Sequence, residues 1–376
     1  MAHQDVTHAE NADLAAPQPI PESCDVLVVG LGPGGAAAAS MAASAGLKVV
    51  AIERNRRFGE PVQCAEFIPL PMGAYARAEG VLLQRIDSMR SVLPSGAVEH
   101  SDFPGLMIDR AVFDRALMHQ AVRAGALLYA SHPLVGLDSA TNCAEIQTAG
   151  GRRVIRYRRL IAADGPHSPV ATALGLPSLE TVATRQYTVA LRRPYTATDI
   201  WLSDDYPGGY AWLFPKGNLA NLGLGADKRL QPNLKQPLEA LHRSLIDAGL
   251  LGADIVARTG GAIPVGGIRQ RIFYEDAVFV GDAAGLCHPI TGAGIAAAVV
   301  SGEAAGRAVV AHLAGDAEAL DDYDEDMRDQ FDAALSRAVA RRRELGQHWR
   351  TPTASHDATH RRGWIAFPEY FVSEAA

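Results

Sequence analysis

The chain has 376 residues, of which 48% are apolar and 20% charged, so disorder is excluded as a description of the whole. A formal net charge of −7 argues against a broad nucleic-acid surface and hence against a nucleic-acid partner. The cysteines, Cys24, Cys64, Cys143 and Cys287, are widely spaced and form no CxxC pair. This spacing indicates neither a disulfide framework nor a zinc module, and it favours a reducing, cytoplasmic compartment.

Residues 1–22 are polar and rich in alanine and proline, and they lack the basic and apolar regions of a signal peptide. We expect a disordered leader here. No apolar stretch approaches the roughly 20 residues that a membrane-spanning helix needs. The sequence therefore predicts no transmembrane segment, while peripheral contact with a membrane stays open.

From Cys24 the chain reads as an apolar strand, a glycine-rich turn, a helix of small residues and a second apolar strand, the order of a βαβ unit. Gly30, Gly32 and Gly35 have the GxGxxG spacing directly after the first strand. Such glycines permit the tight turn, the approach of a pyrophosphate and close packing of helix on strand. Glu53 ends the second strand, where a carboxylate can bind ribose hydroxyls. The unit predicts a dinucleotide site, with a purely structural turn as the alternative.

A second strand–loop–helix segment lies near residue 280. An apolar strand leads into Gly281 and Asp282, and a loop with Gly292 and Gly294 opens a long helix at Ile295. An aspartate at a strand end can hold a polyol hydroxyl, and a helix N-terminus offers N–H groups to a developing anion. Since no second GxGxxG follows a strand, only one dinucleotide has a full Rossmann site. A lone Gly-Asp pair can equally be a turn.

Taken together and in this order, four motifs resemble those of flavoproteins with the p-hydroxybenzoate hydroxylase fold. They are residues 30–53, IDRAVFDRALMHQAVRAGA at 108–126, AADGPHS at 162–168 and GDAAGLCHPITGAGI at 281–295. Within that superfamily, PVQCAEFI at 61–68 and GGYAWLFPKG at 208–217 resemble the geranylgeranyl reductase group. The resemblance covers residues 24–312. It implies an α/β fold in which a Rossmann-like FAD-binding domain carries an antiparallel β-sheet substrate domain.

The same resemblance implies a bound FAD. Its pyrophosphate would lie on the Gly30 loop, its adenosine ribose on Glu53, its ribityl chain on Asp282 and its flavin edge against residues 289–295. NAD(P)H or another reductant would bind only transiently, without a Rossmann domain of its own. The cofactor-binding residues expected are Gly30, Gly32, Pro33, Gly34, Gly35, Glu53, Arg54, Arg110, Asp164, Gly165, Gly281, Asp282, Pro289, Gly292, Gly294 and Ile295.

Between about residues 184 and 262, alternation and turn residues predict antiparallel strands. Tyr210, Trp212 and Phe214 stand at alternate positions and so share one face of a strand. On the residues alone, a core stripe is the ordinary interpretation. The resemblance instead implies a substrate-cavity wall beside the flavin, with Tyr210 and Trp212 catalytic and Phe214 substrate-binding. Lys216 is either a turn lysine or a substrate-binding contact to an anionic head group.

Cys64 lies in the loop that follows Arg54. In the reductases that the chain resembles, a cysteine at this point lies near the flavin ring, which implies a catalytic role in proton delivery or substrate positioning. An inert buried thiol is the alternative. The family pattern is closer to CG-x-G, whereas this chain reads Cys64-Ala65-Glu66-Phe67. The missing glycine affects the local backbone.

The sequence thus predicts a discontinuous FAD-binding domain over residues 23–75, 105–182 and 262–312. Residues 76–104 and 183–261 form the substrate domain, and residues 313–376 form C-terminal helices and a tail. The expected function is an FAD-dependent oxidoreductase that passes hydride from flavin N5 to a C=C bond of an isoprenoid or prenyl-lipid substrate. The alternatives are a flavin-dependent monooxygenase or halogenase on the same scaffold, and a non-catalytic flavin-binding redox scaffold.

Three further patterns have weaker implications. His356 and His360 have the i, i+4 spacing of metal ligands, but no third ligand is fixed. Residues 152–159, RRVIRYRR, favour a solvated hairpin face over an anion-binding patch. The aromatic residues of the tail can cap the pocket, bind a partner or touch a membrane, and the sequence does not choose among these; they are Trp364, Phe367, Tyr370 and Phe371.

Overall fold

The computed structural model describes residues 14–16 and 18–372. Of the expected leader, residues 1–13 and 17 lie outside the described residues. Its later part differs from the expectation, because Leu14 is buried and the N–H of Ala16 donates to the carbonyl of Leu128 at 2.8 Å. The apolar Leu14 side chain belongs to the main hydrophobic core, so this end of the segment is part of the fold.

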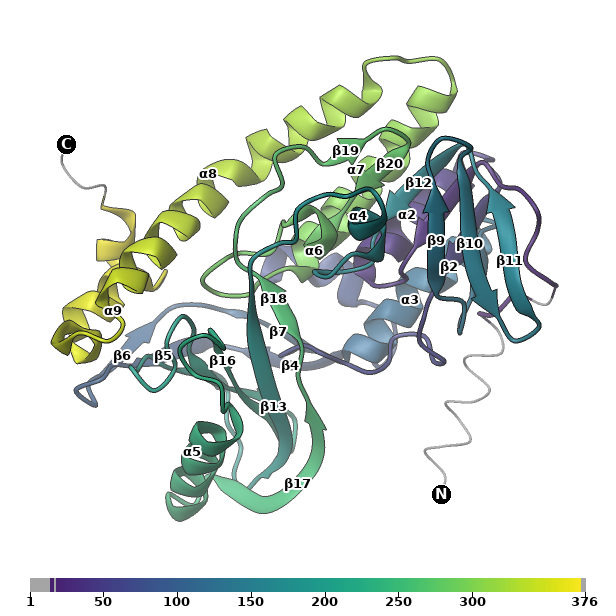
Figure 1. The fold of residues 1–376 in the computed structure, drawn as a ribbon. Coiled ribbons are helices and arrows are strands. Elements are labelled where there is room, and N and C mark those ends of the chain that lie inside the picture. Colours follow the sequence, from purple (N-terminus) through teal and green to yellow (C-terminus); the bar gives the residue numbers. More distant parts are fainter. Residues whose placement is uncertain (1–13, 17, 373–376) are drawn as a thin grey trace.

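A six-stranded sheet with the order β19-β20-β12-β1-β2-β8 forms the first layer (Figure 1). Its neighbouring strands pair in parallel except for the edge strand β19, and β1 and β2 are buried along their whole length. Helices on the faces of a parallel sheet explain such apolar strands. The strands are β1 (Val26–Val29), β2 (Val49–Ile52), β8 (Leu127–Tyr129), β12 (Arg159–Ala162), β19 (Phe273–Tyr274) and β20 (Ala277–Phe279).

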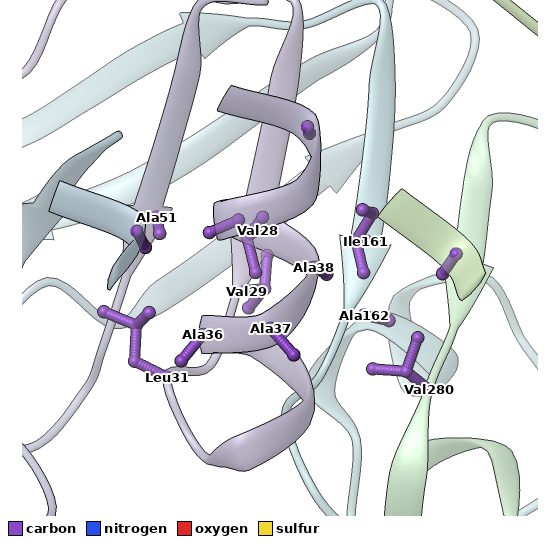
Figure 2. Close-up of a cluster of buried hydrophobic side chains, with 14 of the residues drawn as sticks. Val28, Val29, Leu31, Ala36, Ala37, Ala38, Ala51, Ile161, Ala162 and Val280 are labelled. Carbon is purple, nitrogen blue, oxygen red and sulfur yellow. The ribbon is translucent and has the colours of Figure 1, made fainter. Parts of the chain in front are cut away.

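Small residues bring two helices unusually close on this sheet. Figure 2 shows alanines of α2 packed over Val28 and Val29 of β1. A Cβ at Gly302 of α7 would collide with the carbonyl oxygen of Gly34 in α2, so the contact depends on glycine. The helices of this layer are α2 (Pro33–Ser44), α3 (Arg110–Arg123), α4 (Pro169–Ala173), α6 (Gly281–Ala284) and α7 (Ile295–Leu313).

A second, eight-stranded sheet has the order β17-β13-β16-β15-β14-β5-β6, and β18 pairs with β13. All neighbouring strands are antiparallel except β14 and β5. It joins β5 (Ser88–Val92) and β6 (Val98–Ser101) to strands that begin at residue 181 or later, and it carries α5 (Lys235–Asp247) (Figure 1). Those later strands are β13 (Thr181–Leu191), β14 (Ala197–Trp201), β15 (Ala211–Lys216), β16 (Leu219–Ala226), β17 (Leu251–Thr259) and β18 (Ala262–Pro264).

The remaining strands named here form two three-stranded sheets. The order β3-β7-β4 places a small sheet next to β15, with η1 (Leu70–Ala76) beside it. The order β11-β10-β9 includes the expected hairpin, in which residues 151–156 pair antiparallel with residues 143–148. Their bounds are β3 (Phe67–Pro69), β4 (Leu82–Ile86), β7 (Gly105–Ile108), β9 (Leu134–Asp138), β10 (Cys143–Thr148) and β11 (Gly151–Arg156).

The C-terminal segment crosses the molecule. Helix α8 (Ala319–His348) packs on α7 at its start and leads to the end of the second sheet (Figure 1). There η2 (Pro352–Ser355), α9 (Asp357–Gly363) and η3 (Pro368–Phe371) follow. Asp357 accepts a 2.6 Å hydrogen bond from the hydroxyl of Ser95, and Arg361 pairs with Glu99 at 2.8 Å, so this segment is tied to the β5–β6 hairpin. Within residues 14–16 and 18–372, no helix is long and apolar enough to cross a membrane.

Candidate active site

In the glycine-rich turn after β1, close packing requires glycine at two positions, and a third glycine faces open space. Gly30 has φ 94°, and a Cβ there would collide with the carbonyl of Ala163. A Cβ at Gly35 would overlap the carbonyl oxygen of Gly30. Gly32 has no protein atom within 4 Å of its Cβ position, and it lines a large cavity. The turn is therefore built tightly on the protein side and left open at the N-terminus of α2, where an anion is favoured.

Glu53 lies at the end of β2, beside this turn. Its carboxylate accepts hydrogen bonds from the N–H of Leu31 at 3.1 Å and of Asn55 at 2.8 Å, which fixes its orientation. The neighbouring Arg54 is exposed and does not line the cavity. Glu53 thus lies at a strand end beside the turn, where a carboxylate can bind ribose hydroxyls, whereas no contact among the described residues fixes the side chain of Arg54 there.

The Asp164-Gly165 turn follows β12. One oxygen of Asp164 accepts from the N–H of Val170 at 2.9 Å, and burial raises the pKa of this carboxyl. Its other oxygen is buried without a partner among the residues described. Gly165 has φ 82° and lines the cavity. Asp164 therefore packs against the glycine-rich turn at Gly30, and the backbone of Gly165 faces the cavity.

Asp282 and the start of α7 form another part of the cavity wall, together with Gly281, Gly292, Gly294 and Ile295. Burial raises the pKa of Asp282 to about 6, although the positive charge of Arg110 opposes this. A Cβ at Gly294 would lie 3.0 Å from the Asp282 carboxylate. A polar ligand group that donates hydrogen bonds would compensate the burial of this carboxylate, as a ribityl hydroxyl does. Pro289 is buried in the loop and does not line the cavity.

Arg110 is the first residue of α3 and lines the same cavity. Its guanidinium makes a bidentate ion pair with Asp114, at 2.9 and 3.0 Å. Burial alone would lower the pKa of Arg110, but Asp114 and the sulfur of Cys64 outweigh it and raise this pKa. A fixed cation therefore stands beside the thiol.

The cavity has a volume of about 510 Å³, and residues of both the FAD-binding part of the chain and the second sheet line it. One side is the glycine-rich backbone described above, with Pro33 and Gly34 of α2. The other side is largely apolar and includes Trp364, one of the tail aromatic residues expected as a possible cap. It also includes side chains that the sequence did not single out for the pocket: Phe67, Met89, Phe103, Ile200 and Ile365.

Tyr210, Trp212 and Phe214 all line this cavity. The hydroxyl of Tyr210 donates to the carbonyl of Thr291 at 2.5 Å, and burial raises its pKa. Trp212 donates its indole N–H to Gln186 at 3.0 Å, and the Phe214 ring lies 5.9 Å from that of Phe67. The aromatic wall therefore contacts the loop before α7 directly through Tyr210.

Cys64 also lines the cavity, in a half-buried position. Its sulfur accepts from the N–H of Glu66 at 3.2 Å, and its carbonyl accepts from the side chain of Gln186 at 2.9 Å. Lys216 does not line the cavity and makes an ion pair with Glu66. The cavity thus brings Cys64 together with the aromatic wall, while Lys216 lies behind it.

Two other titratable groups face the cavity. Cys287 is buried, and burial, followed by the charges of Asp282 and Cys64, raises its pKa. Burial lowers the pKa of His288 to about 4, so its imidazole is neutral near pH 7. The Nδ1 atom of His288 faces the N–H groups of Ile290 and Thr291, at 3.4 and 3.2 Å. These contacts give His288 a role in shaping the loop before α7.

In the part of the chain that the structure describes, His356 and His360 do not belong to a cluster of three metal-binding side chains. His360 is buried, and its Nε2 lies 2.8 Å from the carbonyl oxygen of Ala354. No cluster of three or more metal-binding side chains occurs among the residues that the structure covers.

The fold and this site define an FAD-dependent oxidoreductase of the p-hydroxybenzoate hydroxylase-like class. Residues 104–338 match the family described as an FAD binding domain, and residues 25–163 match the FAD dependent oxidoreductases. The chemistry of the glycine turn, Glu53 and the half-buried Asp282 is compatible with a bound FAD. A p-nitrophenol 4-monooxygenase from Pseudomonas putida, 17% identical with a TM-score of 0.70 over 92% of this chain and 95% of that one, shares the fold.

Relatives with higher sequence identity place the chain in one family within this class. The digeranylgeranylglycerophospholipid reductase of Methanothrix thermoacetophila is 33% identical, over 84% of this chain and 85% of the relative. That of Methanopyrus kandleri is 34% identical, over 82% and 88%. A geranylgeranyl bacteriochlorophyll reductase-like structure from Thermoplasma acidophilum, 28% identical, has a TM-score of 0.81 over 92% of this chain and 93% of that one. The chain belongs to the geranylgeranyl reductase family, and the predicted fold class is confirmed.

Proposed function

We propose that this oxidoreductase reduces carbon–carbon double bonds of an isoprenoid lipid. The observation that carries the proposal is the apolar half of the cavity, which opens against residues 292–295, the expected place of the flavin edge. A wall of Trp212, Phe214 and Ile200 suits a flexible hydrocarbon chain better than a polar metabolite. The relatives named as reductases of a geranylgeranyl lipid support the same substrate class.

The chain's own residues orient the substrate and handle the proton. When bound, reduced FAD supplies a hydride to one carbon of the double bond. Cys64 donates its sulfur-bound proton to the neighbouring carbon, so that two hydrogens add in total. The Arg110 guanidinium and the N–H of Glu66 stabilise the sulfur anion until solvent returns a proton. NAD(P)H or another reductant supplies the electrons and binds only transiently.

The proposal is tested by stopped-flow absorbance without oxygen. The holoprotein is reduced with dithionite, the excess reductant is removed, and a dispersed geranylgeranyl lipid is added. We expect the oxidised FAD spectrum to return with the unsaturated lipid and not with its fully saturated counterpart. Equal reoxidation by both lipids, or by neither, would contradict the proposal.

We further propose that the chain contacts a membrane peripherally through an apolar lip at the cavity. Leu70 is 44% exposed and Phe103 is 36% exposed. Phe103 and the exposed Pro69 also line the cavity, and the rings of Phe67 and Phe103 stack at 6.0 Å. Because this lip continues into the cavity, a lipid chain could pass from a bilayer without crossing water.

Vesicle co-sedimentation tests the lip. Leu70→Asp and Phe103→Asp should both lower binding to phospholipid vesicles, and Leu70→Asp, which lies outside the cavity lining, should leave reduction of a detergent-solubilised lipid intact. Val154→Asp is the matched control, since Val154 is exposed on the distant β11 strand. Equal losses in all three variants would count against this surface.

A further inference from the structure

Glu66 is a buried carboxylate in the cavity wall, two residues after Cys64. It is 3% exposed and has φ 71°, a conformation that side chains other than glycine rarely adopt. A buried charge at such a backbone position is unfavourable unless its contacts compensate it. The contacts that compensate the Glu66 carboxylate therefore indicate its structural role.

The carboxylate of Glu66 contacts both helix α3 of the FAD-binding part and two strands of the second sheet. One oxygen accepts from the N–H of Arg110 at 3.0 Å, at the N-terminus of α3, where the helix dipole favours a negative charge. The other accepts from the side-chain amide of Asn221 in β16 at 2.7 Å and pairs with the ammonium of Lys216 in β15. The Glu66 and Lys216 side chains are 4% and 15% exposed, so solvent screens this pair little.

The backbone of the same residue contacts the thiol loop. The N–H of Glu66 donates to the sulfur of Cys64 at 3.2 Å, and its carbonyl accepts from Ile108 of β7 at 2.9 Å. Asn221 also donates to the carbonyl of Ala65 at 3.2 Å. A shift of Glu66 therefore moves the hydrogen-bond donor that faces Cys64.

We propose that Glu66 is a positioning residue, whose ion pair with Lys216 holds the sulfur of Cys64 and the backbone of Arg110 at the start of α3 in place at the cavity wall. In this arrangement Lys216 serves as the counter-ion of Glu66 rather than as a contact to a substrate head group. The inference rests on the proposed function only for the chemical use that it gives Cys64. The placement of the thiol is measurable without any substrate.

The test is the alkylation rate of each cysteine by iodoacetamide in the FAD-loaded protein, followed by peptide mass spectrometry. Glu66→Gln keeps an oxygen acceptor but removes the charge, so the loop loosens and Cys64 should react several-fold faster. Cys143, in the distant β10 strand, is the internal reference and should keep its rate. A Cys64→Ala variant identifies the Cys64 peptide by its loss.

Lys216→Met removes the other half of the pair and should raise the Cys64 rate in the same direction. The double variant should exceed neither single variant, because both changes break one interaction. Lys235→Met is the matched control: it removes the lysine of the exposed Lys235–Glu239 pair on α5, at 3.6 Å, and should leave the rate unchanged.

An unchanged Cys64 rate in Glu66→Gln and Lys216→Met, with the FAD spectrum of the wild type, would overturn the inference. If Glu66→Gln does not fold, Glu66→Gly replaces it, because glycine suits φ 71°. That variant separates backbone strain from positioning, since a purely structural role predicts greater stability with no change in thiol rate. A clear alkylation effect in a protein that reduces no prenyl lipid would refute the proposed function and not this inference.

Discussion

The side-chain amide of Gln186 donates a 2.9 Å hydrogen bond to the backbone carbonyl of Cys64, which is 122 residues away in the sequence. Its carbonyl oxygen accepts at 3.0 Å from the indole N–H of Trp212. One side chain of β13 therefore connects the aromatic wall with the thiol loop. The second sheet sets the position of a loop that belongs to the FAD-binding half of the chain.

Gln186→Leu should lower catalytic activity more than it lowers the stability of the fold. It removes both hydrogen bonds and leaves the buried N–H of Trp212 without a partner, at a cost of about 1–3 kcal/mol. We expect a lower free energy of unfolding in urea, a clear fall in kcat and little change in the Kd of FAD. Gln147→Leu, in the β10–β11 hairpin, is the control. A wild-type kcat in Gln186→Leu would show that the connection is unimportant.

Cys64→Ser tests proton delivery. Serine preserves the size of the side chain but is a far weaker acid than a thiol, so kcat should fall by about 10² or more, the usual scale of general-acid catalysis. FAD binding, followed by its absorbance, should persist. Cys143→Ser should behave as the wild type. Retention of full turnover in Cys64→Ser would assign the proton to solvent or another group.

Gly302→Ala tests the close packing of α2 and α7. Its Cβ would collide with the carbonyl of Gly34, which forms part of the glycine-rich turn, so we expect both a lower Tm and weaker FAD binding. Gly346→Ala in α8 meets nothing within 4 Å and should raise stability by about 0.5–1 kcal/mol. The contrast is read by thermal unfolding with and without added FAD. Similar effects of both substitutions would contradict this packing.

The glycines were within reach of sequence reasoning because their function depends on local spacing, and Gly30, Gly32 and Gly35 lie within six positions of one another. The partners of Cys64 were not. Gln186 and Asn221 reach the loop of Cys64, Ala65 and Glu66 through the strand pairing of the second sheet, which no local pattern reveals. Glu66 was seen only as a missing glycine, since its role depends on Lys216, 150 residues later.

The burial of Asp282 predicts a pH dependence for the FAD-free protein. Its pKa rises from 3.8 to about 6, so between these pH values the folded state binds more protons than the unfolded state. The free energy of unfolding should therefore fall as the pH rises from about 4 to about 6, by at most about 3 kcal/mol. Asp282→Asn should remove this contribution. Urea titrations of both proteins across that range measure it, and parallel pH profiles would contradict the assignment.

Trp364 links the C-terminal segment to the substrate cavity. Its ring lies 4.8 Å from that of Tyr210 in an edge-to-face contact, and it lines the apolar half. Trp364→Ala should cost about 3–5 kcal/mol of stability and, by enlarging the cavity, shift preference toward longer prenyl chains. Phe371→Ala, at an exposed position of the same segment, should change neither. Competition between two chain lengths, read as a ratio of kcat/KM, gives the answer.

The mass of the lipid product tests the central claim most directly. Reduced holoprotein is incubated without oxygen with a geranylgeranyl lipid, and the extracted lipid is analysed by high-resolution mass spectrometry. The account predicts a gain of two hydrogens for each double bond reduced. A lipid of unchanged mass, or a product that gains oxygen when air is admitted, would contradict it.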